Sequence, residues 1–430
     1  MKHLNRAFSS LSVTVALGVA LSSLTPSFAQ SVSQSTNQVV PQTRITQATN
    51  EQNLVRLTGN TSRLTKIGSD LGVAADSFPL NHLQLVLKRS DAQEAALKQL
   101  LHEQEQVGSP SYHKWLTPES YGETYGVSDQ DLKTVTTWLS GHGFSVEGVS
   151  KSRMVITLSG TQQQLRSAFH TEIHHYTLHN QTYFANASDP MLPAALAPVV
   201  AGFSTLSNYG PKALHTTPQL MKHQAGGGWE KTEIKPQIQS DIVQKPRPDY
   251  TINTGTQNAY FVTPSDFATI YNVNPLWAQG IDGTGQTIAI VAASDVNPAD
   301  VDAFRSAFGL PAKKLNYFYV DVNPGLTGDS TESEAALDVE WSGAMAKNAT
   351  VDVVVSAYGP LNAAQYAIDN NLAPILSVSW GECELDLGTS GNQYVNGLWQ
   401  QGRGGYYRSG CGRRFGIGEL RSRSGSILPG

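Results

Sequence analysis

Two patterns of apolar and polar positions follow one another along this chain. In residues 77–209, alternating apolar runs such as Leu83–Lys88 predict strands, and segments with helical spacing follow them. The first predicted helix begins after Ser90, with Gln93 at the capping-box position. The predicted order is β-α-α-β-β-α-β, ending in a strand at 172–178. This order is typical of a ferredoxin-like α+β domain.

Continuous apolar runs replace alternating ones after residue 260. Gln286–Ala293 has the composition of a strand buried on both faces, and Asn297 followed by Pro298 predicts the start of a helix. Strands and helices then alternate as far as Gly381. Residues 261–401 are therefore predicted to form an α/β domain with a doubly wound parallel sheet. In such sheets the chemistry gathers at the carboxyl ends of the strands.

Two segments lack a sustained period. Residues 30–76 are rich in Ser, Thr, Gln and Asn, and we expect a flexible lead-in there. Residues 210–260 carry Gly, Pro, Gln and Thr, which predicts a linker and the place of a maturation cleavage.

The first residues read as an export signal. Residues 1–29 combine a basic start at Lys2 and Arg6, an apolar run from 11 to 24 and a small-residue cleavage pattern at Ser27 to Ala29. The alternative, a membrane anchor, fits less well because this run is short and interrupted by serine. No later stretch is long and apolar enough to span a bilayer. We therefore expect a secreted chain, extracellular or periplasmic, without a membrane partner once the signal is removed.

Charge and cysteine content limit the function classes. The 430 residues include 30 Lys and Arg against 35 Asp and Glu, a net charge of −5. Since no basic face stands out, we expect no nucleic-acid partner. Two cysteines, Cys383 and Cys411, would permit one disulfide in an oxidising compartment.

Glu334 and Asp338 stand four residues apart in an otherwise apolar helical stretch, so their side chains share one helix face. They fit either a solvated acidic face or a buried pair in which one raised pKa suits a general base. All eleven histidines lie at or before His223, so the predicted parallel-sheet segment contains none. That segment therefore cannot run a Ser-His-Asp relay. A carboxylate would have to be the base, and the working pH would be acid.

Several strings are together similar to one family. "SPSYHKWLTPESYGETYGVS" at 109–128, "ESEAALDVEWSGAMAKNATV" at 332–351 and "LSVSWGECE" at 376–384 resemble a secreted sedolisin, a serine-carboxyl peptidase of kumamolisin type with a pro-kumamolisin activation domain. The likeness runs from about Ser77 to Gln401, the linker excepted. It implies an activation domain at 77–209 that covers the cleft, followed by a subtilisin-like peptidase domain.

The resemblance also implies roles for single residues. Glu334 corresponds to the general base and Asp338 to the acid that orients it, whereas the family's nucleophilic serine lies in a GTS motif far downstream. The family's substrate-binding edge strand corresponds to Ser377, Ser379, Trp380 and Gly381. For Trp380, core packing is an equal alternative. Some relatives carry a glutamate at the end of the first sheet strand, and "AIVAAS" offers none here.

Residues 402–430 break the pattern. Six arginines crowd between 403 and 423, and periodicity is lost where the next buried strand is due. A basic nucleic-acid tail is one interpretation. A shifted reading frame explains more, because codons for this tail can be chosen that spell AAEGITVVVAAGDSESESCD one base later. The chain as written would then lack the nucleophile and the family's C-terminal calcium site. No cofactor is expected in it, and the serines of the tail are poor substitutes: Ser409, Ser422, Ser424 and Ser426.

The expected function is that of a secreted, acid-acting serine-type endopeptidase precursor of the sedolisin family. Its partners would be protein or peptide substrates and, within the chain, its own activation domain. As written, the chain is expected to be inactive. The alternative is a non-catalytic secreted fragment whose activation domain binds or inhibits a peptidase, and an acid assay distinguishes the two.

Overall fold

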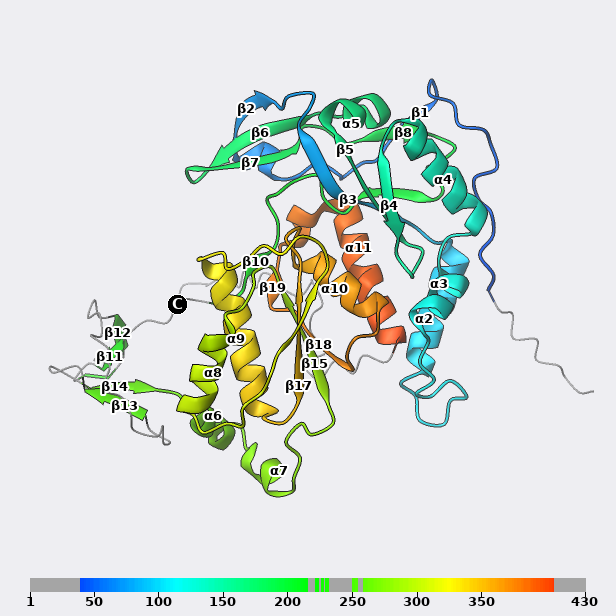
Figure 1. Cartoon of the computed structure of the whole chain (residues 1–430). Coiled ribbons are helices and arrows are strands. Elements are labelled where there is room, and N and C mark those ends of the chain that lie inside the picture. Colours follow the sequence, from blue (N-terminus) through cyan, green and yellow to red (C-terminus); the bar gives the residue numbers. More distant parts are fainter. Residues whose placement is uncertain are drawn as a thin grey trace, which may run out of the picture. The chain divides into compact units, whose positions relative to one another are not determined.

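The structure is a computed structural model of the 430-residue chain (Figure 1). It describes residues 39–215, 221–223, 226–227, 229–231, 250–253 and 258–405. The expected signal peptide at 1–29 and the tail beyond 405, with Cys411 and the four tail serines, lie outside the described residues.

An antiparallel four-stranded sheet organises the first half of the described chain. The strands lie in the order β4-β5-β3-β9. Their bounds are Ser145–Val149, Val155–Thr161, Pro79–Leu87 and Val200–Phe203. Helices α2 (Asp91–Glu103), α3 (Pro118–Tyr125), α4 (Asp129–Gly141) and α5 (Gln162–Phe169) join or follow these strands. The Ser90 side chain accepts from the Gln93 amide and Gln93 reaches back to Ser90, so the predicted capping box is confirmed.

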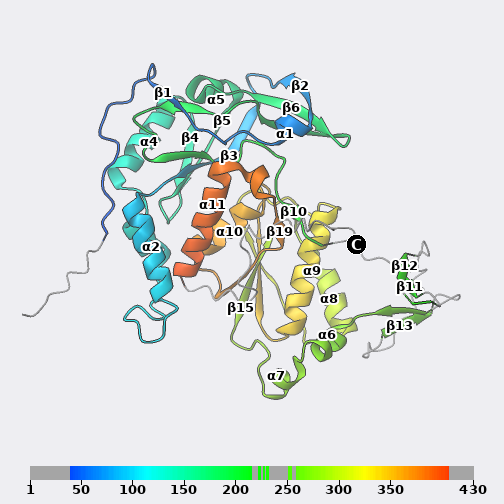
Figure 2. The ribbon, with the colours of Figure 1, turned by 180° about the vertical axis from the view of Figure 1, so that it is seen from behind.

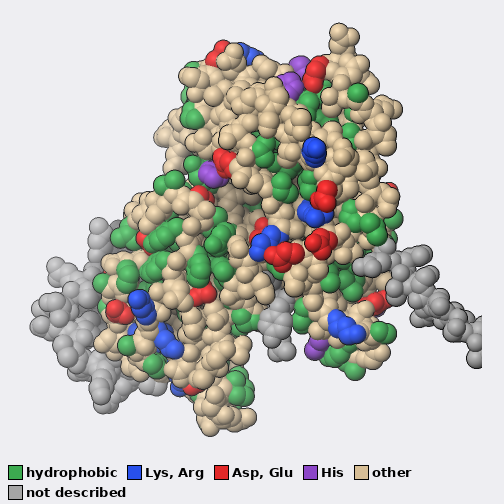
Figure 3. All heavy atoms as spheres, turned by 45° about the vertical axis from the view of Figure 1, so that its right-hand side comes forward, with side chains coloured by type: hydrophobic (Ala, Val, Ile, Leu, Met, Phe, Trp, Pro, Cys, Tyr) green, Lys and Arg blue, Asp and Glu red, His purple; other side chains and the backbone are tan. Residues whose placement is uncertain are grey.

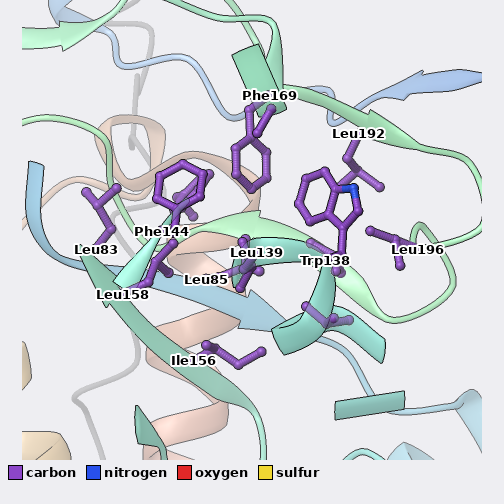
Figure 4. Close-up of a cluster of buried hydrophobic side chains, with 14 of the residues drawn as sticks. Leu83, Leu85, Trp138, Leu139, Phe144, Ile156, Leu158, Phe169, Leu192 and Leu196 are labelled. Atoms are coloured by element: carbon purple, nitrogen blue, oxygen red, sulfur yellow. The ribbon is translucent and has the colours of Figure 1, made fainter. Parts of the chain in front are cut away.

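An aromatic core fixes helices α4 and α5 on one face of this sheet. Trp138 of α4 and Phe169 of α5 meet edge to face with ring centroids 5.2 Å apart, and Phe169 also contacts Phe144 (Figure 4). The Phe203 ring packs against Phe169 as well. Phe169 is completely buried. Edge-to-face pairs add to the burial energy of the rings, so this cluster anchors the domain.

The described part of the expected lead-in, residues 39–76, contains regular secondary structure. It contains β1 (Leu54–Arg56), which pairs with β8 (Met191–Pro193), then α1 (Leu64–Ile67) and β2 (Ser69–Val73). The predicted strand at 172–178 exists as β6 (Ile173–Leu178), but it pairs with β2 and with β7 (Gln181–Asn186) in a second sheet. The fourth strand of the main sheet is β9 instead. Periodicity identifies strands, whereas their partners depend on tertiary contacts.

A parallel four-stranded sheet organises the second half, as predicted. Its order is β16-β17-β15-β18 and its neighbouring strands all run parallel. The strands span Asn316–Tyr319, Thr350–Val355, Thr287–Ala292 and Ile375–Ser377. Ile288 and Ile290 pack on the same side as Val301 and Val339, while Ala289 and Val291 pack on the opposite side.

Helices therefore cover both faces of the parallel sheet (Figure 2). On one face lie α8 (Pro298–Ala307) and α9 (Ser330–Met345), and on the other α10 (Pro360–Asp369) and α11 (Glu384–Gly404). Two short helices precede the sheet, α6 (Pro264–Ile270) and α7 (Asn274–Ala278). Helix α11 also contacts the antiparallel sheet, because the buried Tyr394 hydroxyl accepts from Gln84 Nε2 of β3.

The expected linker contributes short strands. β10 (Lys212–Ala213) pairs with β19 (Trp380–Gly381), and two hairpins follow, β11 (Met221–His223) with β12 (Trp229–Lys231) and β13 (Tyr250–Asn253) with β14 (Asn258–Phe261). None of the helices in the described ranges is both long and apolar enough to cross a bilayer. On the face shown in Figure 3, basic side chains lie close to acidic ones.

Candidate active site

Helix α9 places Glu334 and Asp338 on the side of the parallel sheet where β10 and β19 meet. The helix begins after Asp329, whose carboxylate accepts from the Thr331 amide at 2.8 Å. Glu334 is 3% exposed and Asp338 is partly buried. The pair is thus not a solvated acidic face, which was one of the two interpretations of its spacing.

Asp338 has an unusual environment for a carboxylate. Ser379 Oγ donates to its Oδ1 at 2.9 Å, whereas its buried Oδ2 has no hydrogen-bond partner among the described residues. Burial raises the pKa of Asp338 to about 6, and the Glu334 charge adds to this effect. The Ser379 hydrogen bond and His215 act in the opposite direction. Asp338 therefore gains a proton at mildly acid pH, where an ordinary aspartate stays charged.

His215 approaches the acid pair from the segment before the parallel-sheet domain. Its backbone N–H donates to Glu334 Oε2 at 2.9 Å, and its Nδ1 lies 2.6 Å from the same oxygen. Its side chain is 14% exposed. The parallel-sheet segment itself contains no histidine, as the sequence showed, yet one imidazole still reaches the acids. Sequence reasoning missed it because nothing in the linker pattern predicts that His215 folds back.

The residues before His215 lie along the expected substrate-binding strand. Lys212 pairs with Gly381 and Ala213 with Trp380 in antiparallel register, and the Leu214 amide donates to the Ser379 carbonyl at 3.2 Å. Main-chain pairing of this kind is how an extended peptide adds to an exposed sheet edge. The edge at 379–381 thus holds a strand, and that strand belongs to the chain itself.

The other expected binding residues differ in what they contribute. The Trp380 indole N–H donates to the Val291 carbonyl at 3.4 Å and its ring packs against the core, so its side chain has the packing role and its backbone the pairing role. Ser377 lies opposite Ile290 of β15 in β18, the edge strand of the described parallel sheet.

A Gly-Thr-Ser string at 388–390 also escaped sequence reasoning. Ser390 is 1% exposed, and its hydroxyl hydrogen-bonds to Asn60 and to the Phe203 carbonyl. The Thr389 amide donates to the Gly59 carbonyl at 2.8 Å. The string therefore fastens α11 to residues of the first half of the chain, a structural role that its letters alone do not reveal.

The described residues bring together no group of three or more His, Cys, Asp or Glu side chains that could hold a metal ion. Cys383 is exposed and unpaired in the described part of the chain.

Comparison with known proteins adds independent findings. Residues 68–209 match the family described as "Pro-kumamolisin, activation domain". Xanthomonalisin of Xanthomonas sp. (strain T-22) is 25% identical over 371 residues, which are 80% of this chain and 41% of the relative. Sedolisin of Pseudomonas sp. (strain 101) is 23% identical over 322 residues, 72% of this chain and 49% of the relative. Kumamolisin of Bacillus sp. (strain MN-32) is 25% identical over 282 residues, 64% of this chain and 46% of the relative.

The chain thus spans less than half the length of each of these relatives. The match to the activation domain covers the antiparallel-sheet half, and the xanthomonalisin alignment, at 80% of the chain, extends well beyond it. The chain is thus similar to xanthomonalisin, sedolisin and kumamolisin over 64–80% of its length, and its residues 68–209 match the pro-kumamolisin activation domain.

Proposed function

We propose that this chain is the precursor of a secreted, acid-acting serine-type endopeptidase, held latent by its own residues 212–215. The observation that carries the proposal is the strand 212–213 on 380–381, with His215 bound to Glu334. A segment so placed occupies both the position of a substrate backbone and the oxygen that a general base needs. We also propose a ferredoxin-like fold for residues 77–209 and a subtilisin-like fold for the parallel-sheet domain.

In the active form, Glu334 is the general base. A serine hydroxyl attacks the peptide carbonyl and passes its proton to Glu334, and an acyl-enzyme forms and is later hydrolysed. Asp338 supports Glu334. With a pKa near 6, Asp338 carries a proton in acid and then places no negative charge beside Glu334. The removal of this neighbouring charge is the reason we expect acid conditions to suit the pair.

His215 keeps the precursor latent by occupying one oxygen of the general base, Glu334 Oε2. Glu334 Oε2 accepts from the His215 amide and lies 2.6 Å from its imidazole, so a nucleophile's hydroxyl cannot bind that oxygen at the same time. Cleavage within residues 210–260 would detach the segment from the activation domain. The substrate edge at 379–381 would then accept a peptide from outside.

The proposal also covers residues 402–430, where the family's sequence pattern is lost. The nucleophilic serine is not supplied by Ser390, which is buried against Asn60. We attribute the arginine-rich tail to a shifted reading frame after Gln401, and the written chain is then inactive. The nucleotide sequence tests this directly: the neighbouring frame must encode a buried strand followed by an aspartate.

An acid assay with a denatured protein substrate tests the activity. The written chain and a chain with the frame restored are compared at acid and neutral pH. We expect activity only in the restored chain, only in acid, and lost in its Glu334→Gln variant. Glu332→Gln is the matched control on the same helix, since Glu332 accepts from the Gly328 amide outside the acid pair. Activity in neither chain would favour the alternative, a secreted fragment that binds a peptidase.

A further inference from the structure

Residues 212–215 lie along the edge at 379–381 and place defined side chains against it. We propose that Gly381 is the floor of a subsite for a branched aliphatic side chain, so that the preferred substrates carry leucine, or a residue like it, immediately before the residue that faces Glu334. This inference rests on the proposed peptidase function, because it treats residues 212–215 as lying where a substrate lies.

The register of the strand defines the position. Lys212 lies opposite Gly381 and Ala213 opposite Trp380, and the Leu214 amide donates to the Ser379 carbonyl. His215 then reaches Glu334. Leu214 is therefore the residue immediately before the one at the general base.

The absence of a side chain at Gly381 makes room for the leucine. A Cβ placed on Gly381 would lie 2.8 Å from Leu214 Cδ2, and 3.5 Å from both Cδ1 and Cγ of the same residue. All three nearest atoms thus belong to one side chain. Gly381 does not have the positive φ that would demand glycine for backbone reasons. In the observed position of Leu214, the space next to the Gly381 Cα is filled by the end of the leucine side chain.

The preference should be moderate. Leu214 remains 55% exposed, so only the side facing Gly381 is covered. Partial burial of a leucine favours it over alanine by less than full burial would. We therefore expect an affinity difference of roughly fivefold between leucine and alanine at this position.

A double-mutant cycle in the full chain tests the contact. Hydrogen exchange of the segment 212–215 is measured in the wild type, Gly381→Ala, Leu214→Ala and the double variant. Each single variant should lower protection roughly threefold to tenfold, whereas Gly381→Ala should have little further effect once Leu214 is alanine. Gly397→Ala is the matched control, because a Cβ at Gly397 of α11 would meet no atom within 4 Å. Unchanged protection in Gly381→Ala, or equal effects in both backgrounds, would overturn the proposal.

Peptide competition tests the substrate class. Acetylated and amidated peptides Lys-Ala-Leu-His and Lys-Ala-Ala-His are titrated into the full-length Leu214→Ala chain, whose own segment is weakened, and exchange of residues 212–215 reports displacement. We expect the leucine peptide to act at a roughly fivefold lower concentration, and Gly381→Ala to abolish the difference. Equal potency of the two peptides would refute the subsite even if the restored chain is active in acid. Conversely, absence of acid activity with the ranking intact would refute the peptidase proposal alone.

Discussion

Replacing Asp338 by asparagine removes a carboxylate that the folded chain disfavours in its charged form. Burial raises the pKa of Asp338 to about 6 from an ordinary value of 3.8, and the Glu334 charge contributes. The folded state therefore keeps a proton over a pH range in which the unfolded chain has lost it. The favourable contribution of this group to folding is complete below about pH 4 and disappears as the pH rises through 6.

The size of the effect follows from the two pKa values. The difference between about 6 and 3.8 corresponds to about 3 kcal/mol in the free energy of unfolding, at about 1.36 kcal/mol for each tenfold change in proton affinity. Asparagine at this position cannot titrate. Relative to the wild type, the Asp338→Asn variant should gain about 3 kcal/mol of stability between pH 4 and pH 7.

Urea unfolding of both proteins at a series of pH values between about 4 and 7 measures this difference. The tryptophan fluorescence of the parallel-sheet domain is a suitable signal, because Trp380 packs in its core. Ser379→Ala provides a directional check. It removes the hydrogen bond that lowers the pKa of Asp338, so the pH window should move upward.

Glu340→Gln is the control within the same helix. Burial also raises the pKa of Glu340, to about 7, but the Asp300 charge rather than the acid pair assists it. Its stability window should therefore be independent of Ser379→Ala. A stability difference between wild type and Asp338→Asn that stays constant from pH 4 to pH 7 would refute the reasoning about Asp338.

Two further predictions concern the activation domain. Asp131→Ala should lower the free energy of unfolding by about 2–3 kcal/mol and expose residues 39–45 to limited proteolysis, because buried Asp131 accepts from the Arg44 and Ile45 amides at 2.9 Å. Asp129→Ala on the same helix is the control. Equal cleavage of the two variants would contradict the prediction. Phe169→Ala should destabilise the activation domain by about 3–5 kcal/mol in thermal or urea unfolding, because its ring is completely buried among three other aromatic rings. A loss of stability below about 1 kcal/mol would contradict this and would show that the core collapses around the missing ring.

Local sequence patterns were sufficient for much of the fold. The capping box at Ser90 and Gln93, the continuous run at 286–293 and the Asn297 helix start all correspond to observed elements. Each depends on contacts within a few residues or on the period of one strand or helix. Such local signals do not depend on how the rest of the chain folds.

The spacing of Glu334 and Asp338 by itself determined that the two acids share a helix face. It did not determine whether that face is exposed to solvent or buried. Burial depends on β10 and β19, which come from segments more than 30 residues away on either side. The partner of β6 and the return of His215 to Glu334 are likewise long-range choices. They depend on which apolar surfaces and main-chain edges meet, and a one-dimensional pattern carries no record of that. The sequence thus determined the type of chemistry available, and the tertiary structure decided that the chain's own His215 holds the candidate base.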